Sequence, residues 1–219
     1  MEMDYYLEKR MEKYDKWVAE GKILSPSKII PSPESVTNLQ WVLPTNQVLE
    51  ILRNSRSFAL TDCDCRTRYK NCDKPVEICL LLNDVADIMV QKEKARYIDL
   101  DEAVEKIELA NKHGLVHLTL YHPQHHISAL CSCCECCCHD IQIMKKFERP
   151  DYIAHSDYIA EIDNSSCINC GSCKERCIFD AYEKKDIITY KSEKCYGCGV
   201  CLTTCPTQSI SLKLRVNEK

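Results

Sequence analysis

The feature that most constrains this chain is a doubled run of cysteines near its C-terminus. The runs share the spacing C-x2-C-x2-C-x3-C, lie 28 positions apart, and consist of Cys167, Cys170, Cys173 and Cys177, then Cys195, Cys198, Cys201 and Cys205. A polar tetrapeptide precedes each run, 163–166 in the first and 191–194 in the second. An internal repeat of this kind indicates duplication of one small metal-binding unit.

The spacing suits a 4Fe-4S cluster. Two residues between cysteines let a tight turn wrap three thiolates around one face of a cubane, and in doubled runs the fourth cysteine ligates the other cluster. A zinc ribbon, the alternative, uses two C-x2-C pairs at a longer interval. We therefore expect two crossed ligand sets: Cys167, Cys170, Cys173 and Cys205 for the first cluster, and Cys195, Cys198, Cys201 and Cys177 for the second.

On these motifs, residues 158–214 resemble a bacterial-type ferredoxin with two 4Fe-4S clusters. The resemblance implies strands at 159–162 and 210–214 beside the clusters, and transfer of single electrons at low potential. Gly171, Gly197 and Gly199 would bring backbone N–H groups close to the cluster sulfurs. The chain departs from the family at Ile178, where a proline is usual after the first run.

Ten further cysteines precede this segment. Four are spaced C-x-C-x6-C-x6-C, and six are crowded into residues 131–138, CSCCECCC. Neighbours on an extended chain point to opposite sides, so the six cannot all face one metal, and some serve other centres or none. Redox-active thiols and hydrophobic packing are the alternatives to metal binding. The candidate ligands are Cys63, Cys65, Cys72, Cys79, Cys131, Cys133 and Cys134.

Two rounds of helix and strand surround these cysteines. Segments 47–54 and 101–111 have helical patterns, while 57–61, 115–120 and 126–130 are apolar strands, two of which run into cysteines. We therefore expect one sheet edge to gather the cysteines in a shared site. Pro75 suggests a helix start, which would place Cys79 on a helix.

The fold class predicted is α+β, with a small α/β cysteine-rich N-terminal domain followed by a bacterial ferredoxin-like dicluster domain. The expected divisions are an N-terminal helix and extended segment at 1–43, the cysteine-rich domain at 44–150, and the ferredoxin domain at 151–219. The helix is amphipathic and ends at Gly21; it either folds onto its own domain or docks a partner.

Several single residues have more than one possible role. Arg66 directly follows Cys65 and could compensate cluster charge, bind a small anion, or be an ordinary surface arginine. Four histidines in loops or beside the cysteine run could ligate a metal, but loop histidines at no defined spacing are usually solvated. They are His122, His125, His126 and His139.

The N-terminal arrangement has a resemblance of its own. CDCR at 63–66, the later Cys72 and Cys79, GLVH at 114–117 and CSCC at 131–134 are similar to a region that precedes dicluster ferredoxin domains in anaerobic archaea and bacteria. This resemblance implies an anaerobic cytoplasm and no particular activity.

Charge and targeting signals narrow the expected partners. The formal net charge is -4 with cysteines neutral, and each oxidised cluster with four thiolates adds about -2. Nucleic acid is therefore not expected as a partner. The expected partner is a redox protein with a basic patch on its surface. Residues 1–21 hold no secretory signal, which predicts a cytoplasmic protein, and the apolar runs are too short for a membrane span. The sequence leaves the oligomeric state open.

These observations lead to one main expectation for function. The chain would relay low-potential electrons through two 4Fe-4S clusters to a partner enzyme, with a further metal or third iron-sulfur cluster in the N-terminal domain. The alternatives are a redox enzyme with a substrate-binding N-terminal cluster, and an iron-sulfur or metal carrier. No P-loop and no G-x-G-x-x-G motif is present, so a stand-alone enzyme that uses nucleotides is not expected.

Overall fold

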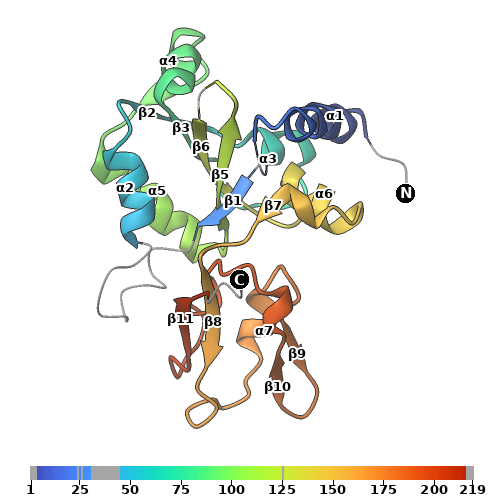
Figure 1. Cartoon of the computed structure of the whole chain (residues 1–219). Coiled ribbons are helices and arrows are strands. Elements are labelled where there is room, and N and C mark those ends of the chain that lie inside the picture. The colour runs from blue at the N-terminus through green and yellow to red at the C-terminus, as the bar shows by residue number, and fades with distance from the viewer. Residues whose placement is uncertain (1–3, 24, 26, 31–44, 125, 216–219) are drawn as a thin grey trace. The chain divides into compact units, whose positions relative to one another are not determined.

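The computed structural model describes residues 4–23, 25, 27–30, 45–124 and 126–215 (Figure 1). The chain forms two compact units: Met1–Lys28, Ser55–Asp99 and Leu118–Ala154 in the first, Ile29–Asn54, Leu100–His117 and His155–Lys219 in the second. The helices are α1 (Tyr5–Ala19), α2 (Thr45–Arg53), α3 (Asp64–Tyr69), α4 (Asn83–Gln91), α5 (Leu100–Lys112), α6 (His139–Lys146), α7 (Ser172–Arg176) and the 3-10 turns η2 (Pro150–Tyr152) and η3 (Ser192–Lys194). The strands are β1 (Ser27–Ile30), β2 (Phe58–Asp62), β3 (Glu77–Leu82), β4 (Arg96–Tyr97), β5 (Val116–His122), β6 (His126–Cys133), β7 (Ile153–Ala154), β8 (Tyr158–Ile162), β9 (Tyr182–Lys184), β10 (Ile188–Tyr190) and β11 (Ile210–Leu214).

Seven strands form one sheet in the order β4-β2-β3-β6-β5-β1-β7. Strand β3 runs antiparallel to both β2 and β6, with Thr61 opposite Cys79 and Leu80 opposite Leu130. Therefore β2 and β6 run in the same direction, and their C-terminal ends lie at the same edge as the start of β3. This edge gathers the N-terminal cysteines.

Strand β3, inside the sheet between β2 and β6, is apolar because both of its faces are covered. Ile78, Leu80 and Leu82 on one face are almost fully buried, and Cys79 on the opposite face is buried as well. A strand covered on both sides has a continuous apolar run rather than an alternating one. The expected helix through Cys79 is therefore wrong: Pro75 precedes a strand, and Cys79 pairs with Thr61 in the sheet.

Helix α1 folds onto its own unit. Asp4 caps its N-terminus through bonds from the backbone N–H groups of Tyr6 and Leu7. Leu7 and Tyr14 are buried, and the ring of Tyr14 lies 6.0 Å from that of Tyr152. The apolar side chains of α1 are thus only partly covered, because Tyr5, Tyr6 and Val18 of the same helix are exposed.

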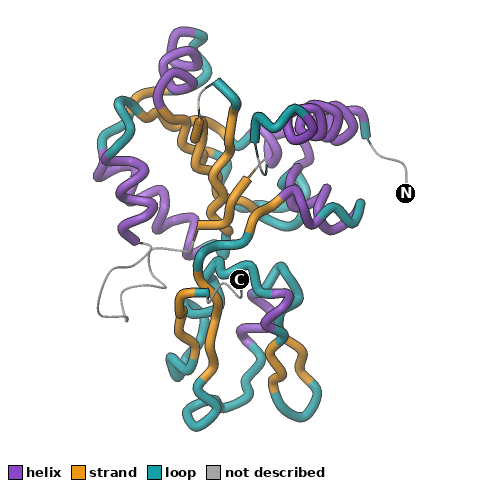
Figure 2. The backbone as a smooth tube through the Cα atoms, in the orientation of Figure 1, coloured by secondary structure: helices purple, strands orange, loops and turns teal. Residues whose placement is uncertain are grey.

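The segment from residue 155 onward consists mainly of loops around two short antiparallel strand pairs (Figure 2). Strand β8 pairs with β11, with Ile210 opposite Ile162, and β9 pairs with β10. Both strands expected beside the clusters are therefore present. Their inward residues, including Tyr158, Ala160 and Leu212, form a core with Tyr182 and several cysteines.

The structure contains helices and sheets as predicted, and the α+β class is confirmed. The two N-terminal cysteine groups do lie near strand ends, although Cys131 and Cys133 are inside β6 rather than after it. Strand β1 lies before the expected boundary near 43, and strand β7 lies after the expected boundary near 150. Both strands nevertheless belong to the seven-stranded sheet. Those boundaries stay a prediction. Among the described residues, none of the helices combines the length and the apolar character needed to cross a membrane.

Candidate metal centres

The first group of C-terminal thiols meets in a small cavity. Cys167, Cys170 and Cys173 of the first run share it with Cys205 of the second run. Gly171 and the apolar side chains of β8, β10 and β11 complete the lining. The donor set of four thiols around one cavity fits a 4Fe-4S cluster, and it is the crossed set expected from the spacing.

The second group lies deeper in the domain. Cys195, Cys198 and Cys201 are buried, and all three interact electrostatically with Cys177 of the first run. Burial raises the pKa of Cys201 to about 12 and that of Cys198 well above its usual range. Buried neutral thiols with such pKa values have no reason to ionise by themselves, whereas a bound metal deprotonates them.

Backbone and side-chain donors point at the sulfurs. The N–H of Gly197 lies 3.4 Å from Cys195 Sγ, and the N–H of Ser209 lies 3.3 Å from Cys205 Sγ. The hydroxyl of Tyr182 donates to Cys201 Sγ at 3.3 Å. Donors of this kind stabilise negative charge on cluster sulfurs and so set the ease of reduction.

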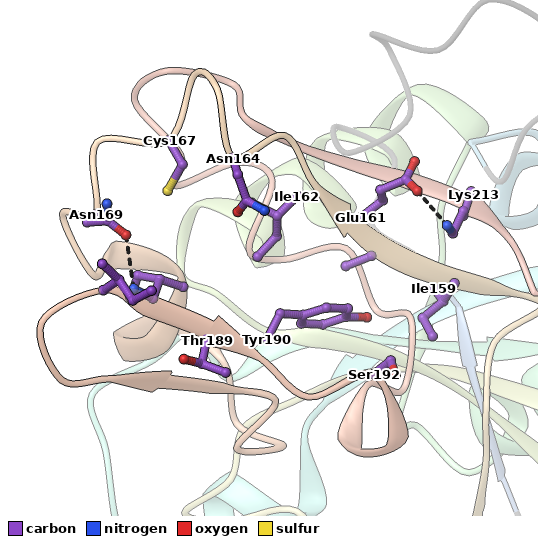
Figure 3. Close-up of a pocket in the computed structure, with 13 residues that line it drawn as sticks. Ile159, Glu161, Ile162, Asn164, Cys167, Asn169, Thr189, Tyr190, Ser192 and Lys213 are labelled. Carbon is purple, nitrogen blue, oxygen red and sulfur yellow. Dashed lines mark hydrogen bonds and ion pairs between the residues drawn. The ribbon is translucent and has the colours of Figure 1, made fainter.

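A groove opens beside the first group (Figure 3). It has a volume of about 680 Å³, and Cys167 and Asn169 lie at one end of it. Lys213 and Glu161 form an ion pair of 2.5 Å at the other end. Cys170 is exposed, so the first group reaches the surface, whereas the second group consists of three buried cysteines and the half-buried Cys177.

Residues 160–212 match the family model of the 4Fe-4S dicluster domain. Residues of the chain are also 33% identical, over 58 positions, to an uncharacterized ferredoxin of Methanocaldococcus jannaschii, and they cover 75% of that protein. This chain belongs to the dicluster ferredoxins through its C-terminal domain. The match takes in 24% of the chain, so the remaining residues stand outside it.

Two longer relatives share the same domain. A second uncharacterized ferredoxin of M. jannaschii is 41% identical over 56 residues, which are 24% of this chain and 37% of that protein. An archaeal-type glutamate synthase [NADPH] of Dehalococcoides mccartyi is 33% identical over 61 residues, which are 26% of this chain and 12% of that protein. The chain therefore spans only a minor part of these two relatives.

Six of the ten cysteines outside the dicluster domain line a second cavity, of about 220 Å³. Cys63 follows β2, Cys65 lies in α3, and Cys79 stands near the start of β3. The antiparallel register of β3 and β6, continued by one residue, places Cys79 opposite Cys131. The six are Cys63, Cys65, Cys79, Cys131, Cys133 and Cys138, called here the six-thiol cavity.

The six thiols are linked in a ring by their hydrogen bonds. Bonds with Cys65 and Cys79 lower the pKa of Cys63, bonds with Cys133 and Cys79 lower that of Cys131 to about 6, and bonds with Cys133 and Cys65 lower that of Cys138. The pKa values of the three partners are raised by the same bonds. The six thiols therefore lie within hydrogen-bonding reach of one another around the cavity.

Two arginines supply positive charge there. Arg66 is 2% exposed, donates from Nε to the Pro75 carbonyl at 2.8 Å and from Nη1 to the Ser132 carbonyl at 2.9 Å. Its Nη2 has no partner among the described atoms. Arg66 is therefore not a surface arginine, because β6 and the loop before β3 enclose it. Arg10 also lines the cavity and pairs with the buried Asp140 at 2.6 Å.

The remaining four N-terminal cysteines meet elsewhere. Cys72, Cys134, Cys136 and Cys137 have sulfurs that all lie within 4.8 Å of one another. Of the predicted ligands, Cys72 and Cys134 thus belong to this group and the other five to the six-thiol cavity. The candidates taken from the sequence omitted Cys136, Cys137 and Cys138, because only the tight turn after β6 reveals which side each faces.

The histidines divide according to their positions. His139 begins α6, and its Nδ1 lies 3.3 Å from Cys65 Sγ at the six-thiol cavity. His122 packs against Trp17 with ring centroids 4.9 Å apart, away from the cysteines that line the cavity. His125 and the side chain of His126 lie outside the described residues.

Proposed function

We propose that this chain is an iron-sulfur electron carrier that relays single electrons at low potential between a donor and a partner enzyme. The observation that carries the proposal is the cavity in which Cys205 joins Cys167, Cys170 and Cys173. With Cys177 beside Cys195, Cys198 and Cys201, two four-thiol sets stand side by side in one small domain. Two closely spaced redox centres are the usual design of a relay rather than of a substrate site.

A 4Fe-4S cluster, when bound, accepts and releases one electron at a time. The protein residues hold and tune that chemistry. The eight thiolates anchor the two groups, the N–H groups of Gly197 and Ser209 donate to sulfur, and Tyr182 donates to Cys201. Burial of Cys195, Cys198 and Cys201 excludes water from the second group.

Electrons would enter or leave near Cys170. This cysteine is exposed, and Ile168, two residues before it, is 63% exposed. Ile187, also 63% exposed, lines the groove together with Cys167 of the same group. Exposed apolar side chains around a redox centre allow a protein partner to exclude water at the point of transfer. An acidic carrier would be steered toward a basic partner surface, with a dependence on salt.

The N-terminal unit would hold a further iron-sulfur cluster in the six-thiol cavity. Six thiols around one cavity, with Arg10 and Arg66 to offset thiolate charge, suit a polynuclear centre better than packing. An anaerobic cytoplasm is also part of this proposal, because the N-terminal cysteine arrangement resembles a region of proteins from anaerobic archaea and bacteria.

One observation favours a second function, a redox enzyme fed by the dicluster domain. The six-thiol cavity has an apolar wall that includes Leu81, Met89 and Leu120 beside the thiols, and the buried Arg66 also lines it. Such a wall beside a cationic side chain could accept a small anionic substrate.

Iron and sulfide analysis of anaerobically purified protein tests the proposal. About eight irons would limit the chain to the two ferredoxin clusters, and about twelve or more would add an N-terminal cluster. Far fewer than eight, or no acid-labile sulfide, would remove the electron-carrier proposal altogether.

The crossed ligand sets have a test of their own in Cys205→Ala. This change should damage the cluster of Cys167, Cys170 and Cys173, because Cys205 lines their cavity. Electron paramagnetic resonance should then show the second cluster intact. Loss of the Cys195 cluster with survival of the first would show that each run holds its own cluster.

A further inference from the structure

The four cysteines outside the six-thiol cavity form a compact group with distinctive distances. Cys72 Sγ lies 3.9 Å from Cys134 Sγ and 3.9 Å from Cys137 Sγ, and Cys137 Sγ lies 3.8 Å from Cys136 Sγ. All four sulfurs lie within 4.8 Å of one another, and among the described residues this is the one group of at least three possible ligands that close together.

These distances are those of a single tetrahedral ion. A metal with four thiolates at about 2.3 Å has sulfurs about 3.8 Å apart, because the edge of a tetrahedron is about 1.6 times its centre-to-corner distance. A 4Fe-4S cluster, in contrast, has its four thiolates on four separate irons at the corners of a cubane, so the sulfurs must stand farther apart. The group has room for one ion and not for a cluster.

The backbone builds the group from two loops. After β6, the chain turns tightly over residues 134–138, and the N–H of Cys138 donates to the Cys134 carbonyl at 3.0 Å. This turn directs Cys134, Cys136 and Cys137 away from the six-thiol cavity. The loop between α3 and β3 supplies Cys72, and Asn71 Nδ2 in that loop donates to the Cys136 carbonyl at 2.8 Å.

Arg66 lies between this group and the six-thiol cavity. It is one of the residues that line the cavity, and its Nη1 lies 3.6 Å from Cys134 Sγ. None of the four cysteines lines the cavity. A metal dication with four thiolates carries a charge of about -2, and a buried guanidinium at this distance offsets part of that charge.

We propose that Cys72, Cys134, Cys136 and Cys137 bind one tetrahedral metal ion, zinc or iron, at a site separate from every cluster. Binding replaces the thiol protons, which pass to solvent, by bonds from four thiolates to the ion, and no electron is transferred. The ion cross-links the loop before β3 to the turn after β6. It therefore holds in place both segments that carry the six-thiol cavity. The proposal does not depend on the electron-carrier function or on a cluster in that cavity.

The test is metal and acid-labile sulfide analysis of the full-length protein and of Cys136→Ser, purified anaerobically. The variant should lose one metal ion per chain with no loss of sulfide and with the resonance signals of the two ferredoxin clusters unchanged. Loss of zinc identifies a zinc site, and loss of one iron without sulfide identifies an iron site. Loss of several irons together with sulfide, or no loss of metal, would overturn the proposal.

Glu135→Ser is the matched control, because Glu135 lies in the same turn and is exposed, with an ion pair to Lys145. It should retain the full metal content. Cys63→Ser should leave the single ion in place, because Cys63 belongs to the six-thiol cavity.

A second measurement applies if Cys136→Ser does not fold. Wild-type protein from zinc-supplemented cells is examined by X-ray absorption at the zinc edge, where one zinc with four sulfurs at about 2.3 Å and no neighbouring iron is expected. Protein from zinc-depleted cells should then contain one iron more than its sulfide. Absence of both results would overturn the proposal.

Discussion

His117 shows how one buried side chain links stability to pH. It is fully buried in β5, and its Nε2 lies 2.8 Å from Asn111 Oδ1, an arrangement that suits a neutral ring with its proton on Nε2. Burial lowers the pKa of His117 from 6.5 to about 4. The unfolded chain binds this proton more readily than the folded chain does. The contribution of His117 to the free energy of unfolding is therefore fully present above pH 6.5 and decreases as pH falls toward 4.

We predict that His117→Gln removes this part of the pH dependence. Between pH 7 and pH 5 the wild type should lose about 2 kcal/mol more than the variant, a value that follows from the two pKa values. Anaerobic urea unfolding at both pH values measures the difference. His113→Gln, a change at an exposed position, should behave as the wild type. Equal slopes for wild type and His117→Gln would mean that His117 binds its proton equally well in the folded and the unfolded chain.

At the scale of an element, the loop that carries Cys195 and Cys198 depends on Gly197. Its φ is +72°, and a Cβ at this position would lie 1.9 Å from the carbonyl oxygen of Tyr158, where β8 begins. The obstacle is backbone, which cannot move aside without breaking the pairing of β8 with β11. The loop geometry and the bond from Gly197 N–H to Cys195 Sγ therefore require glycine.

We predict that Gly197→Ala loses the second cluster, while the first cluster is less affected. The midpoint of urea unfolding should also fall, by more than the cost of placing alanine in a left-handed backbone conformation. Gly21→Ala separates the two effects: φ is +64° there, but no atom lies within 4 Å of the new Cβ, so the expected loss is about 1 kcal/mol. Iron analysis and electron paramagnetic resonance measure the loss of the cluster, and urea unfolding measures the loss of stability. Equal effects of the two changes would contradict the close contact with Tyr158.

At the scale of the whole molecule, we predict that this chain does not take electrons from a nicotinamide by itself. The five glycines stand at helix ends or in the cysteine loops, and no phosphate-binding turn is found in the sequence. Anaerobic protein should therefore bleach with a low-potential chemical reductant and not with NADH or NADPH. Bleaching by either nicotinamide in the absence of a flavoprotein would refute this prediction. The rate of reduction by a protein donor should fall as salt rises.

The sequence by itself determined the dicluster domain, because the first three cysteines of each run are separated by two residues, and this spacing is a local signal. It also predicted the helices and strands around Cys63 and Cys131, since hydrophobic periodicity is a local signal. The crossed ligand sets came from the same spacing, and the placement of Cys205 in the cavity of the first run agrees with them.

Only the tertiary structure decided how the other ten cysteines divide. Cys79 was misplaced on a helix because Pro75 is a local cue, while strand pairing with β2 and β6 is a long-range one. The six cysteines of residues 131–138 could not be sorted from their order, since β6 ends at Cys133 and the tight turn at 134–138 changes which way the later side chains point. Cys72 reaches its partners across 62 residues of chain. The ten cysteines separate into six that line a cavity and four whose sulfurs lie close together. This separation arises only in the folded protein, because packing sets the distances between segments that are remote in the sequence.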